Sequence, residues 1–254
     1  MKKTIGFIGG GRITRIFLQA FQNKEFHPVK IAVFDKSKEV LLALQQKFPA
    51  VRISSLDEAA SQDIVFISLH PPVIMDTLEH VKGNIKAGSC VISLAPKVTM
   101  EKISAKLNGH GNIARMIPNA TSYINKGYNP VCFSKDFNDR ENILEMLKLL
   151  GDTFITEESK MEAYAIASAM LPTYFWFQWH EMHQIGTKMG LDESEARETV
   201  EKTLAAALEI MYHSGLNYEQ VIDLIPVKPI AAYETQIKEI LSNTLSALFE
   251  KIKP

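Results

Sequence analysis

Three consecutive glycines, Gly9 to Gly11, follow a short apolar run, Ile5 to Ile8, and lead directly into a helix-like pattern. The stretch from Thr4 to Phe21 reads TIGFIGGGRITRIFLQAF. A strand, a glycine turn and a helix start in this order form the phosphate-binding part of a dinucleotide-binding βαβ unit. Free N–H groups and the dipole at the helix start attract an anion. The sequence therefore predicts that a cofactor diphosphate binds at this turn.

The residues of the turn have different expected roles. Gly9 allows the tight turn, and Gly11 lets the backbone approach the diphosphate closely. Position 14 is expected where the helix packs on the strand; the motif has Gly or Ala there, and this chain has Thr14. Together with Arg12 and Ile13, these residues are the predicted cofactor-binding residues of the first loop.

The next apolar run, Val29 to Phe34, ends at Asp35. An acidic residue here usually accepts hydrogen bonds from the ribose hydroxyls of NAD, and its charge repels the 2′-phosphate of NADP. Neighbouring side chains would instead bind that phosphate: Arg12, Lys36, Ser37 and Lys38. The two lysines are equally well explained as an exposed surface, so the sequence predicts NAD or NADP without choosing between them.

Further predicted strands end in short loops with proline. Asp63 to Leu69 is followed by His70-Pro71, and Ser89 to Leu94 by Ala95-Pro96. Loops at the carboxyl ends of parallel strands lie on the edge of the sheet where a dinucleotide binds.

Composition limits the protein class. The chain has 254 residues, 46% hydrophobic residues and a formal net charge of −1, which is typical of a soluble globular protein of two domains. This charge gives no electrostatic reason to expect nucleic acid or an anionic membrane as a partner. The longest apolar stretch, Ala163 to Trp179, contains polar residues and is interpreted as a buried helix. Cys90 and Cys132 fall in predicted strands, so we expect free thiols and a cytoplasmic location.

The order of the predicted elements gives the fold class. Strands and helices alternate up to Thr156, which predicts an α/β fold with a parallel, doubly wound Rossmann-type sheet. The rest of the chain has a helical pattern, which predicts a dinucleotide-binding domain of residues 1–157 and a helical domain of residues 158–254. A long helix is expected from Glu162 to Met189, interrupted by Pro172. Because its apolar residues cover most of its circumference, we expect a second subunit to pack around it.

Several longer strings resemble the pyrroline-5-carboxylate reductase family, nearly end to end. They are IGFIGGGRIT, FISLHPP, SLAPKVT, RMIPNATSYINKGYNP (Arg115 to Pro130) and, in the helical half, KMGLDESEA and HSGLN. The resemblance implies an NAD(P)-dependent oxidoreductase whose helical half forms an intertwined dimer. It also implies that Asn119 and the loops at His70-Pro71 and Ala95-Pro96 hold the nicotinamide.

The substrate side departs from the family pattern. The long helix of the family starts with a string rich in serine and glycine; here Ser168, Pro172 and Tyr174 remain, while Met170 and Leu171 fill space that glycines would leave open. A second family string of small and hydroxyl residues corresponds to residues 225–230, IPVKPI, which has neither glycine nor hydroxyl. We therefore expect the anion site of the substrate pocket to be rebuilt or given up.

Three residues are candidates for proton donor or substrate anchor: Lys228, Tyr174 and Ser168. Lys228 could pair with a substrate carboxylate or, with a lowered pKa, donate a proton. Its other interpretation is a solvated loop lysine.

A short histidine motif, His180 to His183, reads H-E-M-H and lacks the H-E-x-x-H spacing of zinc enzymes. No metal site is predicted there, and packing or a subunit contact explains it better.

The sequence thus favours a reductase that acts on the C=N bond of a small imine or imino acid, with 1-pyrroline-5-carboxylate as one candidate. A homodimer or higher homo-oligomer is expected. One alternative is a related oxidoreductase with a keto acid or a deazaflavin coenzyme as acceptor. Another is a nucleotide-binding protein without turnover.

Overall fold

The computed structural model describes residues 3–254 and divides into two compact units. The first unit extends up to Met170 and includes Phe249–Pro254, and the second is Leu171–Leu248. The predicted domain boundary after residue 157 stays a prediction. In the part of the chain that the structure describes, no helix has both the length and the apolar character needed to span a bilayer.

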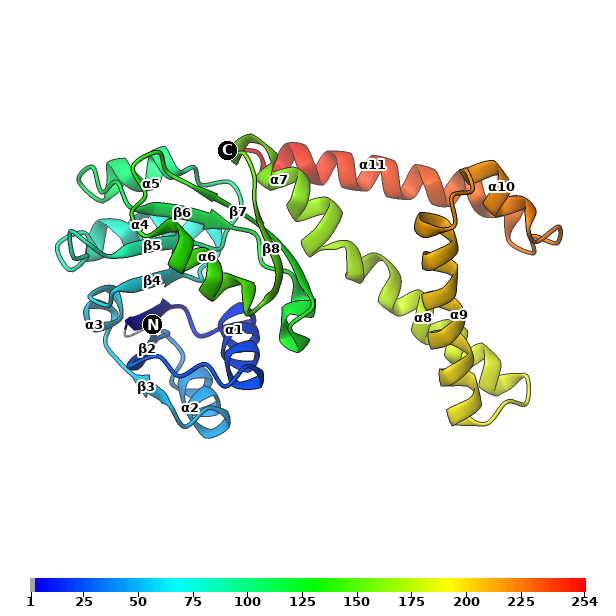
Figure 1. The fold of residues 1–254 in the computed structure, drawn as a ribbon, viewed down its shortest axis with the longest axis horizontal. Helices are drawn as coiled ribbons and strands as arrows, with labels where there is room; N and C mark the ends of the chain where they lie inside the picture. Colours follow the sequence, from blue (N-terminus) through cyan, green and yellow to red (C-terminus); the bar gives the residue numbers. More distant parts are fainter. Residues whose placement is uncertain (1–2) are drawn as a thin grey trace. The chain divides into compact units, whose positions relative to one another are not determined.

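The first unit is built on one eight-stranded sheet with the order β3-β2-β1-β4-β5-β6-β7-β8 (Figure 1). Neighbouring strands are parallel except for β6 and β7. This confirms the predicted Rossmann-type α/β fold. The strands are β1 Thr4–Ile8, β2 Lys30–Phe34, β3 Val51–Ile53, β4 Ile64–Ile67, β5 Cys90–Ser93, β6 Ile113–Met116, β7 Gly127–Phe133 and β8 Gly151–Ile155.

The antiparallel pairing of β6 with β7 differs from the expected all-parallel sheet. Only residues 117–126 connect the two strands, and they form a 3-10 helix, Ala120–Ile124, followed by Asn125 in the left-handed conformation. A parallel connection needs a crossover of a dozen or more residues, usually with a full helix. The chain therefore turns back on itself here. After helix α6, β8 pairs parallel to β7, so these two strands both run opposite to β1–β6.

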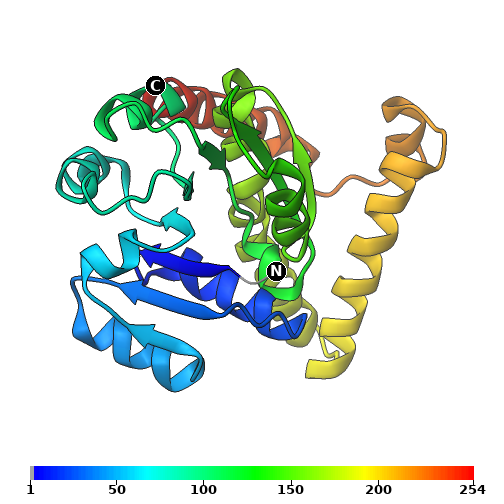
Figure 2. The ribbon, with the colours of Figure 1, turned by 60° about the vertical axis from the view of Figure 1, so that its left-hand side comes forward.

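Helices cover both faces of this sheet (Figures 1 and 2). Alternating strand residues point to opposite faces, so Phe66 belongs to a core with α1, α2 and α6, whereas Val65 and Ile67 belong to a core with α3, α4 and α5. The helices are α1 Arg12–Asn23, α2 Lys38–Lys47, α3 Leu56–Ala60, α4 Pro71–Val81, α5 Met100–Lys106 and α6 Arg140–Lys148.

Aromatic packing fixes the first βαβ unit. Phe7 on β1 stacks on Phe66 of β4 with ring centroids 4.8 Å apart, and Phe17 of α1 meets Phe66 edge-on at 5.1 Å. All three rings are fully buried. Because such rings bury large apolar areas, they hold the glycine turn between β1 and α1 on a rigid base.

The segment of residues 161–188 differs from the expected long helix with a single interruption. It consists of α7, Met161–Tyr164, a π-helical turn, Ala165–Ala169, and then α8, Leu171–Lys188. Pro172 lies in the first turn of α8, where a missing N–H is tolerated. The break therefore comes before the proline and is taken up by one wide turn.

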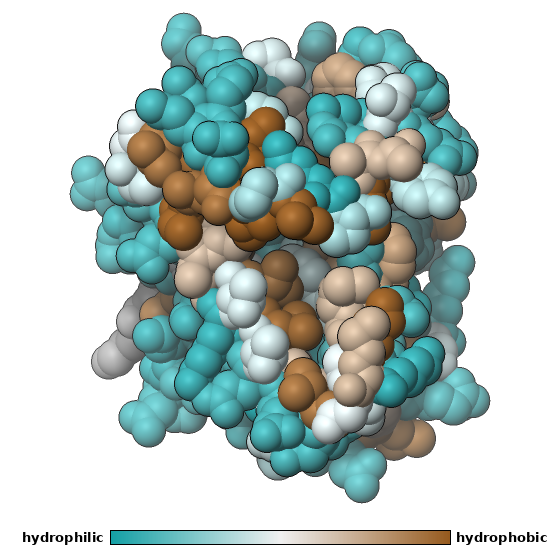
Figure 3. Space-filling view, turned by 90° about the vertical axis from the view of Figure 1, so that its right-hand side faces the viewer, coloured by the Kyte–Doolittle hydropathy of each residue, from teal (hydrophilic) through white to brown (hydrophobic). Residues whose placement is uncertain are grey.

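The second unit contains α8, α9 Glu193–His213, α10 Tyr218–Asp223 and most of α11 Glu234–Ile252. Gly190, with φ +107°, ends α8, and Asp192 caps α9 through a capping box with Glu195. Of the residues described in this unit, only Ala196 is a buried hydrophobic residue. Figure 3 shows hydrophobic side chains, in brown, gathered on the surface.

Candidate functional site

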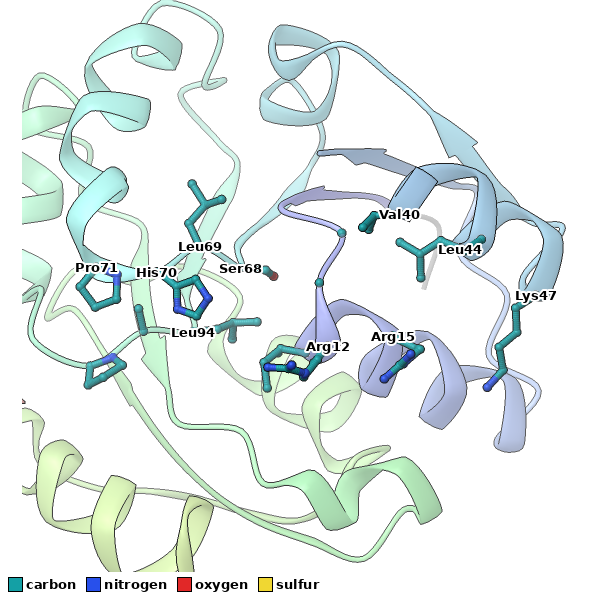
Figure 4. Close-up of a pocket in the computed structure, with 16 residues that line it drawn as sticks. Arg12, Arg15, Val40, Leu44, Lys47, Ser68, Leu69, His70, Pro71 and Leu94 are labelled. Carbon is teal, nitrogen blue, oxygen red and sulfur yellow. The ribbon is translucent and has the colours of Figure 1, made fainter. Parts of the chain in front are cut away.

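A cavity of about 820 Å³ lies in the first unit, at the carboxyl ends of β1, β4 and β5 (Figure 4). This is the edge of an open α/β sheet at which ligands bind. The residues that line the cavity are Gly10, Gly11, Arg12, Ile13, Arg15, Val40, Ala43, Leu44, Lys47, Ser68, Leu69, His70, Pro71, Leu94, Ala95 and Pro96.

The glycine turn has the conformation that a phosphate site requires. Gly9 has φ +106°, and a Cβ atom there would lie 2.4 Å from the Ser68 carbonyl oxygen, so only glycine fits. Gly11 has room for a Cβ atom and forms the N-cap of α1, with no side-chain cap and no acidic residue in the first turn. The first N–H groups of α1 therefore face the cavity without a competing carboxylate, as an anion site needs.

Thr14, where the motif has a smaller residue, supports the turn directly. Its hydroxyl Oγ1 donates to the Gly9 carbonyl oxygen at 2.6 Å, and the side chain is fully buried. The hydroxyl thus ties the first turn of α1 to Gly9, the glycine with positive φ in the loop. Thr14 therefore supports the conformation of the glycine turn without lining the cavity itself.

Asp35 connects the first and second loops. Its Oδ2 accepts from the Gly10 N–H at 2.7 Å, and its Oδ1 accepts from the Ser37 N–H at 2.9 Å. Ser37 in turn caps α2, because its Oγ accepts from the Val40 N–H at 3.2 Å. The carboxylate therefore braces two loops within the protein, which is a role separate from the expected contact with a ribose.

Positive charge gathers at this end of the cavity. Arg12 and Arg15 stand one turn apart on α1, and Lys47 of α2 lies in line with them (Figure 4). Lys36 and Lys38 are exposed beside the Asp35 loop. Among residues 3–254, no ion-pair partner lies within 4 Å of Arg12, Lys36 or Lys38. These cations are available to an anionic ligand.

The other end of the cavity is formed by the loops after β4 and β5. His70 precedes α4 as its N-cap, and Pro71 is the first residue of that helix. Ala95 and Pro96 face the same cavity from the loop after β5. The structure thus brings the predicted residues of both loops together with the glycine turn.

Asn119 and Ser168 lie together, but outside the residues that line the cavity. The Asn119 Nδ2 donates to the Ser168 carbonyl oxygen at 3.0 Å and to its Oγ at 3.2 Å. The Ser168 hydroxyl donates to the Tyr128 carbonyl oxygen at 2.9 Å, and both side chains are buried. Pro172 has no N–H for the Ser168 carbonyl, so Asn119 supplies a donor at the helix break. In this arrangement both side chains stabilise the fold.

Tyr174 and Lys228 belong to the second unit. Burial raises the pKa of the Tyr174 phenol, which therefore stays protonated and able to donate at neutral pH. Lys228 is exposed in the single chain, and its charge contributes to lowering the pKa of Glu234, after the larger effect of Lys238. Their roles as proton donor or substrate anchor stay predictions.

The two cysteines are not activated nucleophiles, and the described residues contain no group of metal-ligating side chains. Cys90 and Cys132 are free and buried, and burial raises the pKa of Cys132 to about 11, so it stays a thiol. Among residues 3–254, no three His, Cys, Asp or Glu side chains could hold one metal ion. His183 Nε2 lies 3.2 Å from Glu193 Oε1. This histidine of the motif therefore takes part in the packing of α8 against α9.

The sequence did not indicate several parts of the site. Arg15, Val40, Ala43, Leu44 and Lys47 line the cavity but were not predicted. The i, i+4 spacing of Val40 and Leu44 marks an apolar helix face, yet nothing in it shows that this face meets the glycine turn. A Cβ on Gly10 would lie 3.0 Å from Leu44 Cδ1 and 3.1 Å from Val40 Cγ1.

Two families match separate parts of the chain. Residues 4–97 match the family described as NADP oxidoreductase coenzyme F420-dependent, and residues 158–228 match pyrroline-5-carboxylate reductase dimerisation. The first match covers the glycine turn and the loops after β4 and β5. The second begins just after the sheet and covers α7 to α10.

Relatives with known names agree with these matches. The chain is 24% identical, over 218 residues, to the pyrroline-5-carboxylate reductase of Corynebacterium melassecola, covering 84% of this chain and 81% of the relative. Its fold is similar to that of the Plasmodium falciparum pyrroline carboxylate reductase solved with NADP bound, with a TM-score of 0.85, 20% identity and coverage of 99% and 97%. The corresponding enzyme of Coxiella burnetii gives a TM-score of 0.72 at 23% identity, with coverage of 99% and 95%.

Proposed function

The chain belongs to the pyrroline-5-carboxylate reductase family, and on that premise we propose that it is an NAD(P)H-dependent reductase of a C=N bond. The proposed substrate class is a small imine or cyclic imino acid, with 1-pyrroline-5-carboxylate and its reduction to proline as the first candidate. The observation that carries this proposal is that the glycine turn and the loops after β4 and β5 line the same cavity.

Each end of the cavity has residues suited to one part of the cofactor. The first N–H groups of α1 would bind the diphosphate, and Arg12 would add positive charge. The loops at His70-Pro71 and Ala95-Pro96 would hold the nicotinamide. A reduced pyridine nucleotide supplies the hydride when it is bound. The protein would orient the acceptor, exclude water and deliver a proton to the nitrogen.

The test is an assay of NADH and NADPH oxidation at 340 nm with pyrroline-5-carboxylate and related cyclic imines. Oxidation with the five-membered imine supports the proposal, and the absence of oxidation with every imine contradicts it. The family that residues 4–97 match favours a deazaflavin coenzyme as the alternative acceptor. The assay therefore includes a deazaflavin coenzyme, and it also includes keto acids. Binding of the dinucleotide without turnover of any acceptor would indicate a nucleotide-binding protein.

We further propose that NADPH is preferred over NADH. The three cations without ion pairs, Arg12, Lys36 and Lys38, support this preference, because a 2′-phosphate placed near them gains charge-assisted hydrogen bonds. The Asp35 carboxylate already accepts two backbone N–H groups, which gives it a structural role that does not depend on a ribose.

The double variant Lys36→Met/Lys38→Met should weaken NADPH binding by about tenfold, because two exposed cations each contribute about 0.5–1 kcal/mol toward a phosphate. Affinity for NADH should change by less than about twofold. Isothermal titration calorimetry measures both. Lys24→Met is the matched control, because this exposed lysine lies at the opposite end of α1. Equal losses for both cofactors would contradict a 2′-phosphate site at the second loop.

We also propose a homodimer or a higher homo-oligomer. The support is the apolar surface of the second unit, where Phe177 is 68% and Tyr212 is 74% exposed, together with the dimerisation family that residues 158–228 match. Apolar surface of this extent is typical of an interface. Light scattering should give a multiple of the 28.5 kDa chain mass, and a particle of 28.5 kDa would contradict the proposal.

Lys228 is proposed as an anchor for the substrate carboxylate. It stands in the segment where the family has small and hydroxyl residues, and no ion-pair partner lies within 4 Å of it among the described residues. Lys228→Ala should raise the KM for carboxylate-bearing imines by about tenfold or more, since a charge-assisted contact is worth about 1.5–3 kcal/mol, and leave cofactor affinity unchanged. Unchanged kinetics of Lys228→Ala would contradict the anchor and support the interpretation of Lys228 as a solvated loop lysine.

The proposed location is the cytoplasm. The free thiols of Cys90 and Cys132 support a reducing compartment. The test is fractionation of cells that express the full chain, and recovery in an oxidising compartment would contradict the proposal.

A further inference from the structure

The loop after β5 contains a strained residue next to the cavity. Lys97 has φ +75°, in the left-handed region that is unfavourable for a residue with a Cβ atom. Its side chain is exposed, and the two residues before it, Ala95 and Pro96, line the cavity. Backbone in such a conformation persists only where the surrounding structure holds it.

A buried carboxylate holds this residue. Glu162 Oε1 accepts from the Lys97 N–H at 3.0 Å, and the Glu162 side chain is almost fully buried. The same oxygen accepts from Arg115 Nη2 at 2.5 Å, and Arg115 is fully buried in β6. Because the acceptor is itself fixed by a buried cation, the position of the Lys97 backbone is determined by α7 and β6 together.

A second carboxylate binds the same guanidinium but supports a different residue. Glu158 Oε1 accepts from Arg115 Nη1 at 3.0 Å and from the Met100 N–H at 2.7 Å. Met100 is the first residue of α5, so Glu158 satisfies a free N–H group at a helix start. Glu162 therefore serves the strained residue beside the cavity, and Glu158 serves the helix that follows.

We propose that Glu162 is a positioning residue for the nicotinamide end of the cofactor. It acts through the Lys97 N–H and keeps the backbone of residues 95–97 in the conformation that shapes the cavity wall. Glu162 has no contact with the cavity itself, since it is absent from the residues that line it. This inference rests on the proposed function, in which that wall receives the nicotinamide.

The test compares two ligands that share the diphosphate but differ at the nicotinamide. Glu162→Met removes the acceptor at similar size. The unpaired Lys97 N–H then favours another conformation of the loop, and binding of the nicotinamide has to restore the original one. The Kd of NADPH should therefore rise by about tenfold. The Kd of 2′-phospho-ADP-ribose, which has no nicotinamide, should change by less than about twofold. Glu162→Gln keeps one acceptor oxygen and should remain close to the wild type. Glu158→Met is the matched control and should leave the ratio of the two Kd values unchanged.

The exposed Lys97 gives a second test that leaves the buried cluster intact. Lys97→Pro removes the N–H and fixes φ near −65°, so it should reproduce the selective loss of NADPH affinity. Lys97→Gly should partly restore that affinity in the Glu162→Met background, because glycine adopts φ +75° without steric cost.

Two results would overturn the positioning role. One is an unchanged ratio of the two Kd values in Glu162→Met and Lys97→Pro, whether neither ligand or both ligands lose affinity, and the other is the absence of rescue by Lys97→Gly. If the wild-type protein binds 2′-phospho-ADP-ribose and NADPH normally, these results leave the proposed function standing. If the wild-type protein binds neither ligand, the proposed function fails, and the positioning role fails with it.

Discussion

Replacing Gly11 by aspartate should abolish dinucleotide binding and leave the fold intact. A Cβ atom at Gly11 meets no heavy atom within 4 Å, and aspartate is a favourable N-cap residue. The free energy of unfolding should therefore stay the same or rise slightly. The new carboxylate would stand at the free N–H groups of α1 and face the diphosphate. At about 4 Å and an effective dielectric of about 20, each unit of like charge costs about 4 kcal/mol, so the Kd should rise by more than about 100-fold.

Gly11→Asn is the matched control for this variant. Asparagine caps a helix as well as aspartate does and has nearly the same size, but it carries no charge. It should weaken binding far less than Gly11→Asp, with the same stability in urea unfolding. If Gly11→Asp bound NADPH and NADP⁺ like the wild type, the diphosphate would have to bind elsewhere.

Replacing Arg115 by methionine should lower the free energy of unfolding by about 3–5 kcal/mol. Arg115 is fully buried and neutralises two carboxylates, Glu158 and Glu162. Removing the cation leaves the buried Glu162 uncompensated, and breaking a buried ion pair on one side costs about this much. Urea unfolding at a fixed protein concentration measures the loss, because association also contributes to the stability of an oligomer.

The double variant Arg115→Met/Glu162→Met separates the charge from the packing. Removing both partners leaves no buried unpaired charge at this position, so part of the lost stability should return. The remaining loss should correspond to the unpaired Lys97 N–H and to Glu158, which is partly exposed to solvent. A loss below about 1 kcal/mol in the single variant would mean that the cluster contributes little to folding.

The sequence predicted the fold well because the first half follows local rules. Apolar runs that end in glycine or proline loops marked β1, β4 and β5, and the family resemblance built on these strings is confirmed. The reversed direction of β7 could not be read from its own residues. It depends on the short connection after β6, and the path of that connection is determined by tertiary packing.

The candidate site was predicted in part, for the same physical reason. The residues of the glycine turn, His70-Pro71 and Ala95-Pro96 lie in short motifs and were found. The wall from α2 and the cluster of Arg115 with Glu158 and Glu162 join segments far apart in the chain. Nothing marks Arg115 as buried in the sequence, although two glutamates four residues apart indicate a single helix face.

The two hydrogen bonds of Asp35 show the same limit. Its position after β2 is the expected one for a ribose contact, and no motif indicates that both oxygens accept N–H groups of neighbouring loops. Such backbone contacts depend on the conformation of Gly10 and Ser37, which is set by the folded loop.

A crystal structure of the protein with NADP⁺ tests the central claim most directly. The diphosphate should lie within hydrogen-bond distance of the first N–H groups of α1, next to Gly11. The nicotinamide should reach the loop of Ala95 and Pro96. A diphosphate found away from the glycine turn, in crystals soaked at saturating NADP⁺, would contradict the proposed cofactor site and with it the reductase function.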